Sequence, residues 1–149
     1  MDSWSSVPEM SVRRSGAGVG VLDGILYAVG GHDGPLVRKS VEAYNPESES
    51  WTQVADMSYC RRNAGMLKSI IIFHKGKSCN WFLQVLFNFV LAGVVSLNSM
   101  LYVVGGDDGS ANLASVEVYN PKTDTWSLLP SSMGIGRSYA GVAIIDKPM

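Results

Sequence analysis

The sequence predicts an all-β protein made of repeated four-stranded antiparallel sheets, and three observations support this prediction. First, a block with a glycine pair, Tyr-Asn-Pro and a tryptophan occurs twice in full, and each landmark moves by 75 residues, from Gly31 to Gly106 and from Trp51 to Trp126. Second, short apolar runs alternate with turn residues in both copies. Third, one such sheet cannot bury both of its faces alone, so the repeat requires neighbouring sheets. A repeat of this kind is typical of the blades of a β-propeller.

The first full repeat begins with two strands joined by a tight turn. Residues 17–22 are small and apolar, and residues 25–30 form an almost continuous apolar run, which suits a strand buried on both faces. Asp23-Gly24 lies between the two runs and predicts a hairpin, because both central residues of such a turn adopt positive φ. The glycine pair that follows ends the second strand, since glycine permits close backbone approach.

Two further strands complete this repeat. A polar loop at 32–39 leads into an alternating segment at 40–44, which favours a strand. Asn45-Pro46 then starts a turn, and 51–54 forms a short outer strand.

The second full repeat covers 92–129, with its first turn at 97–100. Parts of two more repeats flank the full ones, because Trp4 precedes Trp51 by 47 residues and 137–145 begins a further copy. A closed propeller needs at least about four blades, so this chain cannot close one alone. We expect a partial β-propeller with about two four-stranded antiparallel blades and stubs of their neighbours. The spaced aromatic residues are expected to pack within the blades: Tyr44, Trp51, Tyr119 and Trp126.

An insert interrupts the repeats. The two step lengths differ by 28 residues (75 − 47), and Ala64-Gly65 reappears as Ala92-Gly93, so we interpret 66–91 as a splice-derived or intron-derived segment. It is rich in large apolar residues, and we expect it to lower solubility and displace the loop before it. Its apolar stretch of about 15 residues is short of the ~20 that span a membrane, so membrane insertion is not expected. The predicted segments are the tail of a preceding repeat (1–16), a repeat with the start of the next (17–65), the insert (66–91), a second repeat (92–136) and a closing strand stub (137–149).

The bulk composition excludes some classes of partner. A net charge of −1 gives no general attraction to nucleic acid or to an anionic membrane surface. Cys60 and Cys79 lie in unrelated segments, so no disulfide is expected, and unpaired thiols fit a reducing, cytoplasmic compartment. The residues that follow Met1 contain neither the basic nor the apolar part of a signal peptide.

The repeats resemble a known family. The order Gly-Gly, Tyr-Asn-Pro, Trp and then Met-x3-Arg-x3-Gly, at Met10, Arg14 and Gly18, resembles the kelch repeat. The resemblance covers residues 2–65 and 92–149. These residues resemble the C-terminal part of kelch-like proteins, with kelch-like proteins 2 and 3 among the most similar. In that family a kelch propeller follows BTB and BACK domains, which recruit a cullin-RING ubiquitin ligase. The resemblance implies a non-catalytic, substrate-recognition piece of a ligase adaptor.

The resemblance also implies a partner-binding face made of two sets of loops, which precede the first strand of a blade or follow its Gly-Gly strand. Arginine suits such a face, because its planar guanidinium pairs bidentately with carboxylates, and a tyrosine adds a ring that can stack. The implied ligand is an acidic degron-like segment, by resemblance one of the with-no-lysine kinases. The partner-binding residues expected on this face are Arg13, Arg14, Ser15, His32, Asp33, Arg61, Arg62, Asn63, Asp107, Asp108, Arg137, Ser138 and Tyr139.

Structural roles remain open for some of these residues. Arg14, Arg61 and Arg137 occupy one position of the repeat, so they could instead tie blades together through hydrogen bonds to neighbouring carbonyls. Asp33 and Asp107 could cap their own turns.

Three other functions are weighed against the adaptor. The chain could be an actin-binding module associated with the cytoskeleton, which co-sedimentation with filaments would distinguish. It could be a truncated isoform without a function of its own, because open blades expose unpaired strand edges. Enzymatic activity is not expected, and the sequence predicts no bound metal or cofactor. A copper oxidase site needs converging His, Tyr and Cys ligands, whereas this chain has only His32 and His74. No nucleophile has a partner base, and the glycines at 16–20 lack the dinucleotide-binding spacing.

Overall fold

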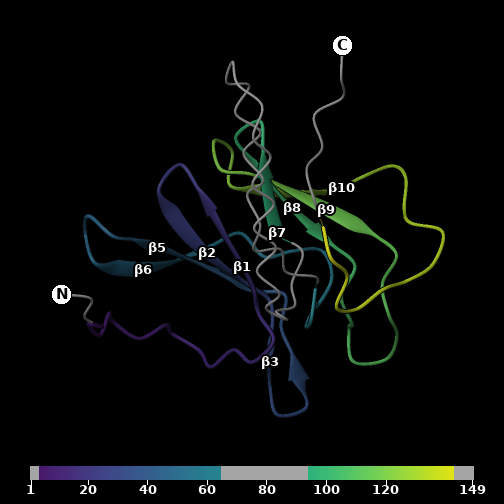
Figure 1. Cartoon of the computed structure of the whole chain (residues 1–149), viewed down its shortest axis with the longest axis horizontal. Coiled ribbons are helices and arrows are strands. Elements are labelled where there is room, and N and C mark those ends of the chain that lie inside the picture. The colour runs from purple at the N-terminus through teal and green to yellow at the C-terminus, as the bar shows by residue number, and fades with distance from the viewer. Residues whose placement is uncertain (1–3, 65–93, 143–149) are drawn as a thin grey trace, which may run out of the picture.

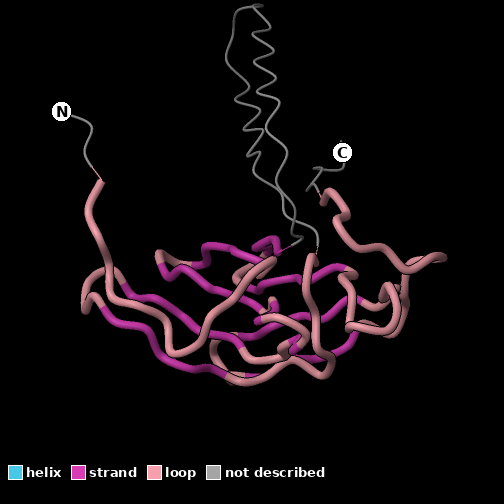
Figure 2. Tube along the Cα trace, turned by 90° about the horizontal axis from the view of Figure 1, so that it is seen from below, coloured by secondary structure: helices cyan, strands magenta, loops and turns pink. Residues whose placement is uncertain are grey.

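The computed structural model describes residues 4–64 and 94–142. The described chain consists of strands and loops (Figure 2), and none of it forms a helix long and apolar enough to cross a membrane. The predicted insert at 66–91 lies outside the described residues, as do 1–3 and 143–149.

The strands form two four-stranded antiparallel sheets, the first and second blades (Figure 1). Their orders are β1-β2-β5-β6 and β7-β8-β9-β10, and a small hairpin, β3-β4, extends from the loop between β2 and β5. This architecture confirms the predicted partial all-β propeller. The first blade contains Gly18–Leu22 (β1), Ile25–Val29 (β2), Val41–Asn45 (β5) and Ser50–Val54 (β6). The small hairpin contains His32–Asp33 (β3) and Leu36–Val37 (β4). The second blade contains Val94–Leu97 (β7), Met100–Val104 (β8), Val116–Asn120 (β9) and Thr125–Leu128 (β10).

The two predicted hairpin turns are confirmed. Asp23 and Gly24 adopt φ of 51° and 80° between β1 and β2. Asn98 and Ser99 adopt φ of 52° and 58° at the same place in the second blade. Two successive left-handed residues give this turn a twist that matches the twist of the strands.

Each blade has two faces, because successive side chains of a strand point to opposite sides and directly paired residues share a side. We call the face nearer the C-terminal end of the chain the trailing face and the opposite one the leading face. On the first blade, Tyr27 pairs with Ala43 and Val29 pairs with Val41. These four side chains are buried and form its trailing face.

The leading face of the second blade packs against this surface. It carries Leu101 and Val103, which are fully buried, with Tyr119 beside them. The rings of Tyr27 and Tyr119 are 5.7 Å apart across the interface. A Cβ at Gly20 would come within 2.7 Å of Val94 Cγ1, so the close approach of the two blades depends on this glycine.

The repeated tryptophans join each blade to the segment before it. We call these segments, which end at the repeated arginine, the straps, and they cover 8–14, 55–61 and 131–137. The indole of Trp51 donates to the Pro8 carbonyl at 2.9 Å. The indole of Trp126 donates to the Ala55 carbonyl at the same distance. The straps at 8–14 and 55–61 are thereby fastened to the blades that follow them.

Candidate partner-binding face

A glycine pair in each blade lets the loops approach each other closely. Gly31 has φ of 89°, and its amide donates to the Arg61 carbonyl at 2.7 Å. A Cβ at this position would lie 2.9 Å from the Ser15 carbonyl oxygen, closer than real Cβ contacts. The glycine therefore allows the loop after β2 to lie against the loop before β1.

Backbone hydrogen bonds hold the two loop sets together at one end of the blades. Ser15 and His32 exchange two bonds of 2.8 Å. Arg62 and Asp107 exchange two bonds of the same length in the next blade. The loops named in the sequence analysis are thus neighbours in space.

Successive repeats are also bonded to one another at this end. Gly16, Asn63 and Tyr139 occupy the same repeat position, and all three have left-handed backbones, with φ of 58°, 51° and 57°. The Asn63 amide donates to the Gly16 carbonyl at 2.8 Å, and the Tyr139 amide donates to the Asn63 carbonyl at 2.7 Å. This ladder aligns the arginine-bearing loops of three repeats side by side.

Arg14 lies at the end of the first strap and is buried against the first blade. Its Nη2 is 2.9 Å from Glu42 Oε2, and 1% of the Arg14 side chain is exposed. Its Nη1 donates to the carbonyls of Gly30 and Ser40, each at 2.8 Å. Five donor groups in a fixed plane suit this multiple bonding.

Arg61 repeats the same arrangement across the interface between the blades. Its Nη2 is 2.8 Å from Glu117 Oε1, and neither side chain is exposed. The guanidinium also donates to the Gly105 carbonyl and to both oxygens of Ser115. Arg14 and Arg61 can reach a partner only by leaving buried carboxylates. For these two residues the geometry supports the alternative role of tying blades together.

The carboxyl of Glu42 is held in its ionised form. Burial acts to raise its pKa, but hydrogen bonds from the Ser11 amide, at 2.7 Å, and from Arg14 outweigh burial and lower it. A carboxylate that accepts several hydrogen bonds is the expected partner for a buried guanidinium.

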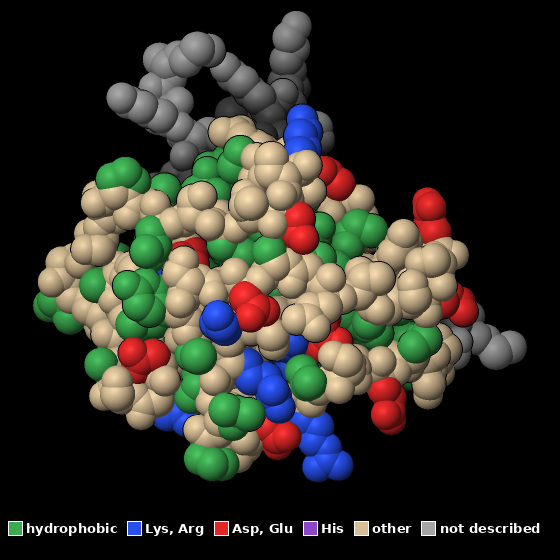
Figure 3. Space-filling model, turned by 180° about the vertical axis from the view of Figure 1, so that it is seen from behind, with side chains coloured by type: hydrophobic (Ala, Val, Ile, Leu, Met, Phe, Trp, Pro, Cys, Tyr) green, Lys and Arg blue, Asp and Glu red, His purple; other side chains and the backbone are tan. Residues whose placement is uncertain are grey.

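Other predicted residues remain accessible at the loop end. Arg13 and Ser15 are exposed, whereas Arg62 and Asn63 are half-buried. Arg62 Nε lies 2.9 Å from Asp107 Oδ1, with 29% and 23% of the two side chains exposed. Figure 3, which views the molecule from behind, shows basic and acidic side chains next to one another. Because Arg62 pairs with Asp107, the arginines of the loop end belong to a surface of mixed charge.

The predicted acidic residues are partly engaged with their own loops. Asp107 accepts the Gly109 amide at 2.8 Å and so caps its turn, while Asp108 accepts the Ser110 amide at 2.7 Å. The hydrogen bonds from Ser110 lower the pKa of Asp108. Asp33 is exposed, and its carboxylate lies 3.7 Å from Arg38.

The residues of the third loop are the most accessible. Arg137 is exposed and forms no side-chain ion pair with the rest of the described chain. Ser138 is half-buried, and 51% of Tyr139 is exposed. His32 is half-buried, and its Nδ1 lies 3.0 Å from the Gly34 carbonyl.

The residues that receive the arginines were not predicted from the sequence. Ser40 and Glu42 in the first blade correspond to Ser115 and Glu117 in the second. A charged residue repeated in the middle of a predicted strand was the signal that could have found them, since buried carboxylates need partners. Arg38 was missed as well, and its Nε donates to the Arg13 carbonyl at 3.2 Å.

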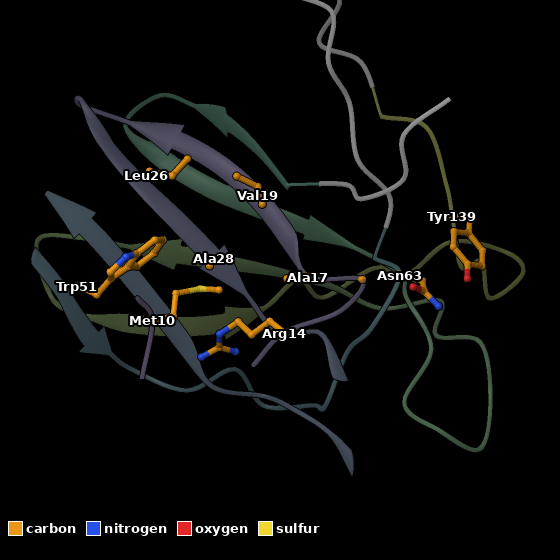
Figure 4. Close-up of a pocket in the computed structure, with 10 residues that line it drawn as sticks. Met10, Arg14, Ala17, Val19, Leu26, Ala28, Trp51, Asn63 and Tyr139 are labelled. Carbon is orange, nitrogen blue, oxygen red and sulfur yellow. The ribbon is translucent and has the colours of Figure 1, made fainter. Parts of the chain in front are cut away.

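The described residues, 4–64 and 94–142, contain no group of three His, Cys, Asp or Glu side chains that could hold a metal ion. They do line a cavity of about 430 Å³ that is open to solvent on the leading face of the first blade (Figure 4). Met10, Leu26 and Trp51 line it, and the lining is mainly apolar.

The two repeats match a family model described as the Kelch motif, over residues 13–58 and 89–133. The chain belongs to the Kelch motif family. It is 31% identical to kelch-like protein 15 of Danio rerio over 98% of this chain, and 28% identical to kelch-like protein 26 of the same organism over 99%. It is also 33% identical to the F-box/kelch-repeat protein At1g22040 of Arabidopsis thaliana over 91%.

The chain spans about a quarter of the length of these relatives, with 23% of kelch-like protein 15 and 28% of kelch-like protein 26 covered. Among solved structures it is similar to YjhT, with a TM-score of 0.64 at 15% identity, over 91% of this chain and 44% of that one. This likeness supports the propeller fold.

Proposed function

We propose that this kelch module is a non-catalytic part of a substrate-recognition adaptor for a cullin-RING ubiquitin ligase. Its loop end binds acidic, degron-like segments of protein substrates, with a segment of the with-no-lysine kinases as the first ligand to test. Recruitment of the ligase resides in domains outside this chain. We place the module with kelch-like proteins 2 and 3 within the family because of its loop sequences, and in the cytoplasm.

The observation that carries this proposal is the set of accessible arginines on loops aligned by the Gly16–Asn63–Tyr139 ladder. Arg13 and Arg137 are exposed, and Arg62 is partly exposed. Guanidinium groups on neighbouring loops can pair with successive carboxylates of an extended peptide. The exposed ring of Tyr139 offers a surface for an apolar side chain between them.

Arg62 is paired with Asp107 before any peptide binds. Its guanidinium already pairs with Asp107, so an acidic peptide must replace that carboxylate. A surface ion pair of this kind contributes about 0–1 kcal/mol, and exchange for a carboxylate of the ligand therefore costs little. The same Asp107 repels acidic ligands that fail to displace it, which favours ligands with the right spacing of charge.

Binding of a fluorescent acidic peptide, measured by anisotropy, tests the proposal. Arg13→Ala, Arg62→Ala and Arg137→Ala should each weaken binding, on the order of tenfold for each charge-assisted hydrogen-bonded pair that is lost. Lys122→Ala is the matched control, because Lys122 is exposed in the β9–β10 turn at the opposite end of the blade. Equal weakening by Lys122→Ala would indicate general electrostatic attraction and overturn the proposal. Co-sedimentation with actin filaments, unaffected by the arginine variants, would favour the cytoskeletal function instead.

A further inference from the structure

Each blade interface uses one trailing face and one leading face, and the described chain has one of each that is uncovered. The trailing face of the second blade carries Tyr102, Val104, Val116 and Val118, which correspond by the 75-residue step to the buried Tyr27, Val29, Val41 and Ala43. All four are half-buried in the second blade. We call this surface the open trailing face.

The leading face of the first blade is uncovered in part, because Ala28 and Glu42 are buried while the rest of the face is accessible, and we call it the open leading face. Val19 is 39% exposed, whereas its counterpart Val94 is 4% exposed at the internal interface. Leu26 is half-buried, whereas its counterpart Leu101 is completely buried. The cavity of about 430 Å³ lies on this surface beside Trp51 (Figure 4).

The two open faces are complementary, because the internal interface already joins surfaces of the same design. Tyr27 packs on Tyr119 there, and the corresponding pair for the open faces is Tyr102 with Tyr44. We propose that a second copy of this chain docks its open leading face on the open trailing face of the first. The contact is head-to-tail, so it can repeat, and it closes into a ring or continues as an open chain of copies.

Charge supports the same pairing. Arg61 projects from its strap into the next blade and pairs there with Glu117. Arg137 occupies the equivalent position of the last strap, and it is exposed. Its strap is held to its own blade in the same way, since the Arg137 amide donates to the Leu113 carbonyl at 3.0 Å and the Gly106 amide donates to the Arg137 carbonyl at 2.8 Å. Arg137 is thus positioned to pair with a Glu42 of another copy.

That Glu42 is held by its own Arg14 in a single copy, so docking requires an exchange. The straps ending at Arg61 and Arg137 have backbone bonds to the preceding blade. Within the described residues, the strap at 8–14 is fastened only to the following blade, by Trp51 and Glu42, by side-chain bonds from Arg14 to two carbonyls and by the bond from Arg38 to the Arg13 carbonyl. An incoming Arg137 arrives on an ordered backbone and loses less conformational entropy on pairing. It therefore displaces Arg14 from Glu42 as the apolar faces meet.

Sedimentation velocity of the full chain over a range of concentrations tests the proposal. We expect species whose masses are multiples of 16.1 kDa and whose proportion rises with concentration. A ring of about two to four copies would contain the roughly four to eight blades of a closed propeller. A single 16.1 kDa species at every concentration up to about 100 μM, a range that detects weak interfaces, would overturn the proposal. Its surfaces would then await further blades or other partners.

Two blocked variants distinguish specific docking from aggregation. Val118→Arg places a charge on the open trailing face, and Leu26→Arg places one on the open leading face. Each variant alone should be monomeric, and an equimolar mixture should form a dimer of twice 16.1 kDa, because one intact face of each kind remains. Absence of that dimer, or association that neither substitution changes, would contradict head-to-tail docking.

Arg137→Ala provides a variant that spares the fold, because the side chain is exposed. It should weaken self-association on the order of tenfold, the effect of losing charge-assisted hydrogen bonds. Circular dichroism should show unchanged β structure. Lys122→Ala serves as the control and should associate as the wild type does. Unchanged association of Arg137→Ala would exclude the arginine exchange.

Discussion

The guanidinium of Arg61 and the carboxylate of Glu117 form a 2.8 Å ion pair in which both side chains are fully buried. Arg61 follows the first blade in sequence, and Glu117 lies in β9, an inner strand of the second blade. The pair therefore joins consecutive blades at the centre of their interface. Its counterpart, Arg14 with Glu42, shows that the same device occurs in both repeats.

Removing Arg61 should be costly for stability. Arg61→Ala leaves Glu117 as an unpaired buried carboxylate, which is expected to lower the free energy of unfolding by about 3–5 kcal/mol. Arg62→Ala is the control, because its partly exposed pair with Asp107 contributes about 1 kcal/mol or less. Urea denaturation of both variants measures the difference. Similar losses of unfolding free energy in the two variants would show that burial does not make the Arg61–Glu117 pair more important for stability.

Stability should decline in acid through Glu42. Hydrogen bonds hold its pKa below the ordinary value of about 4.3. A carboxyl with a lowered pKa contributes stability that is fully present above its unfolded-state pKa and is lost as pH falls through the folded-state pKa. Unfolding free energies between pH 7 and 3 should therefore fall mainly below about pH 4.3. Glu42→Gln should be less stable at pH 7 and show a smaller slope in this range, and an unchanged slope would argue against this role.

Tyr119 should make the stability of the fold decline as the pH rises into the alkaline range. Burial, followed by the hydrogen bond from its hydroxyl to Asp124 Oδ1 at 2.9 Å, raises its pKa. The unfolded chain then releases the proton first, so stability is full below the ordinary tyrosine pKa of about 10 and declines above it. Tyr119→Phe should lose about 1 kcal/mol at neutral pH and decline less above pH 10. Tyr59→Phe, which changes an exposed ring, should behave as the wild type in thermal and urea unfolding.

The glycine pairs should tolerate no side chain. Gly106 has φ of 97°, and a Cβ there would lie 3.1 Å from the Arg62 carbonyl oxygen. Gly106→Ala should therefore cost about 1–3 kcal/mol through backbone strain. At Gly134 a Cβ would meet no atom within 4 Å, and its φ is not positive. Gly134→Ala should leave the urea midpoint close to that of the wild type, and a loss equal to that of Gly106→Ala would exclude this explanation.

The strands and their turns could be predicted because their causes are local. Asp23-Gly24 supplies the positive φ that a two-residue hairpin requires, and the alternation at 40–44 is a property of neighbouring residues. The 75-residue step then implied that the second sheet repeats the first. The loop sets that flank the blades followed from the same repeat, and Ser15 does lie against His32.

The sequence by itself thus determined the blades, their number and the positions of their turns. The tertiary structure decided what the repeated arginines do, because a guanidinium at one repeat position can face solvent or a buried carboxylate. Arg61 is buried since a blade follows it and presents Glu117, whereas the equivalent Arg137 is exposed at the end of the described blades. Burial depends on which surfaces meet across the fold, and a pattern within one repeat does not contain that information.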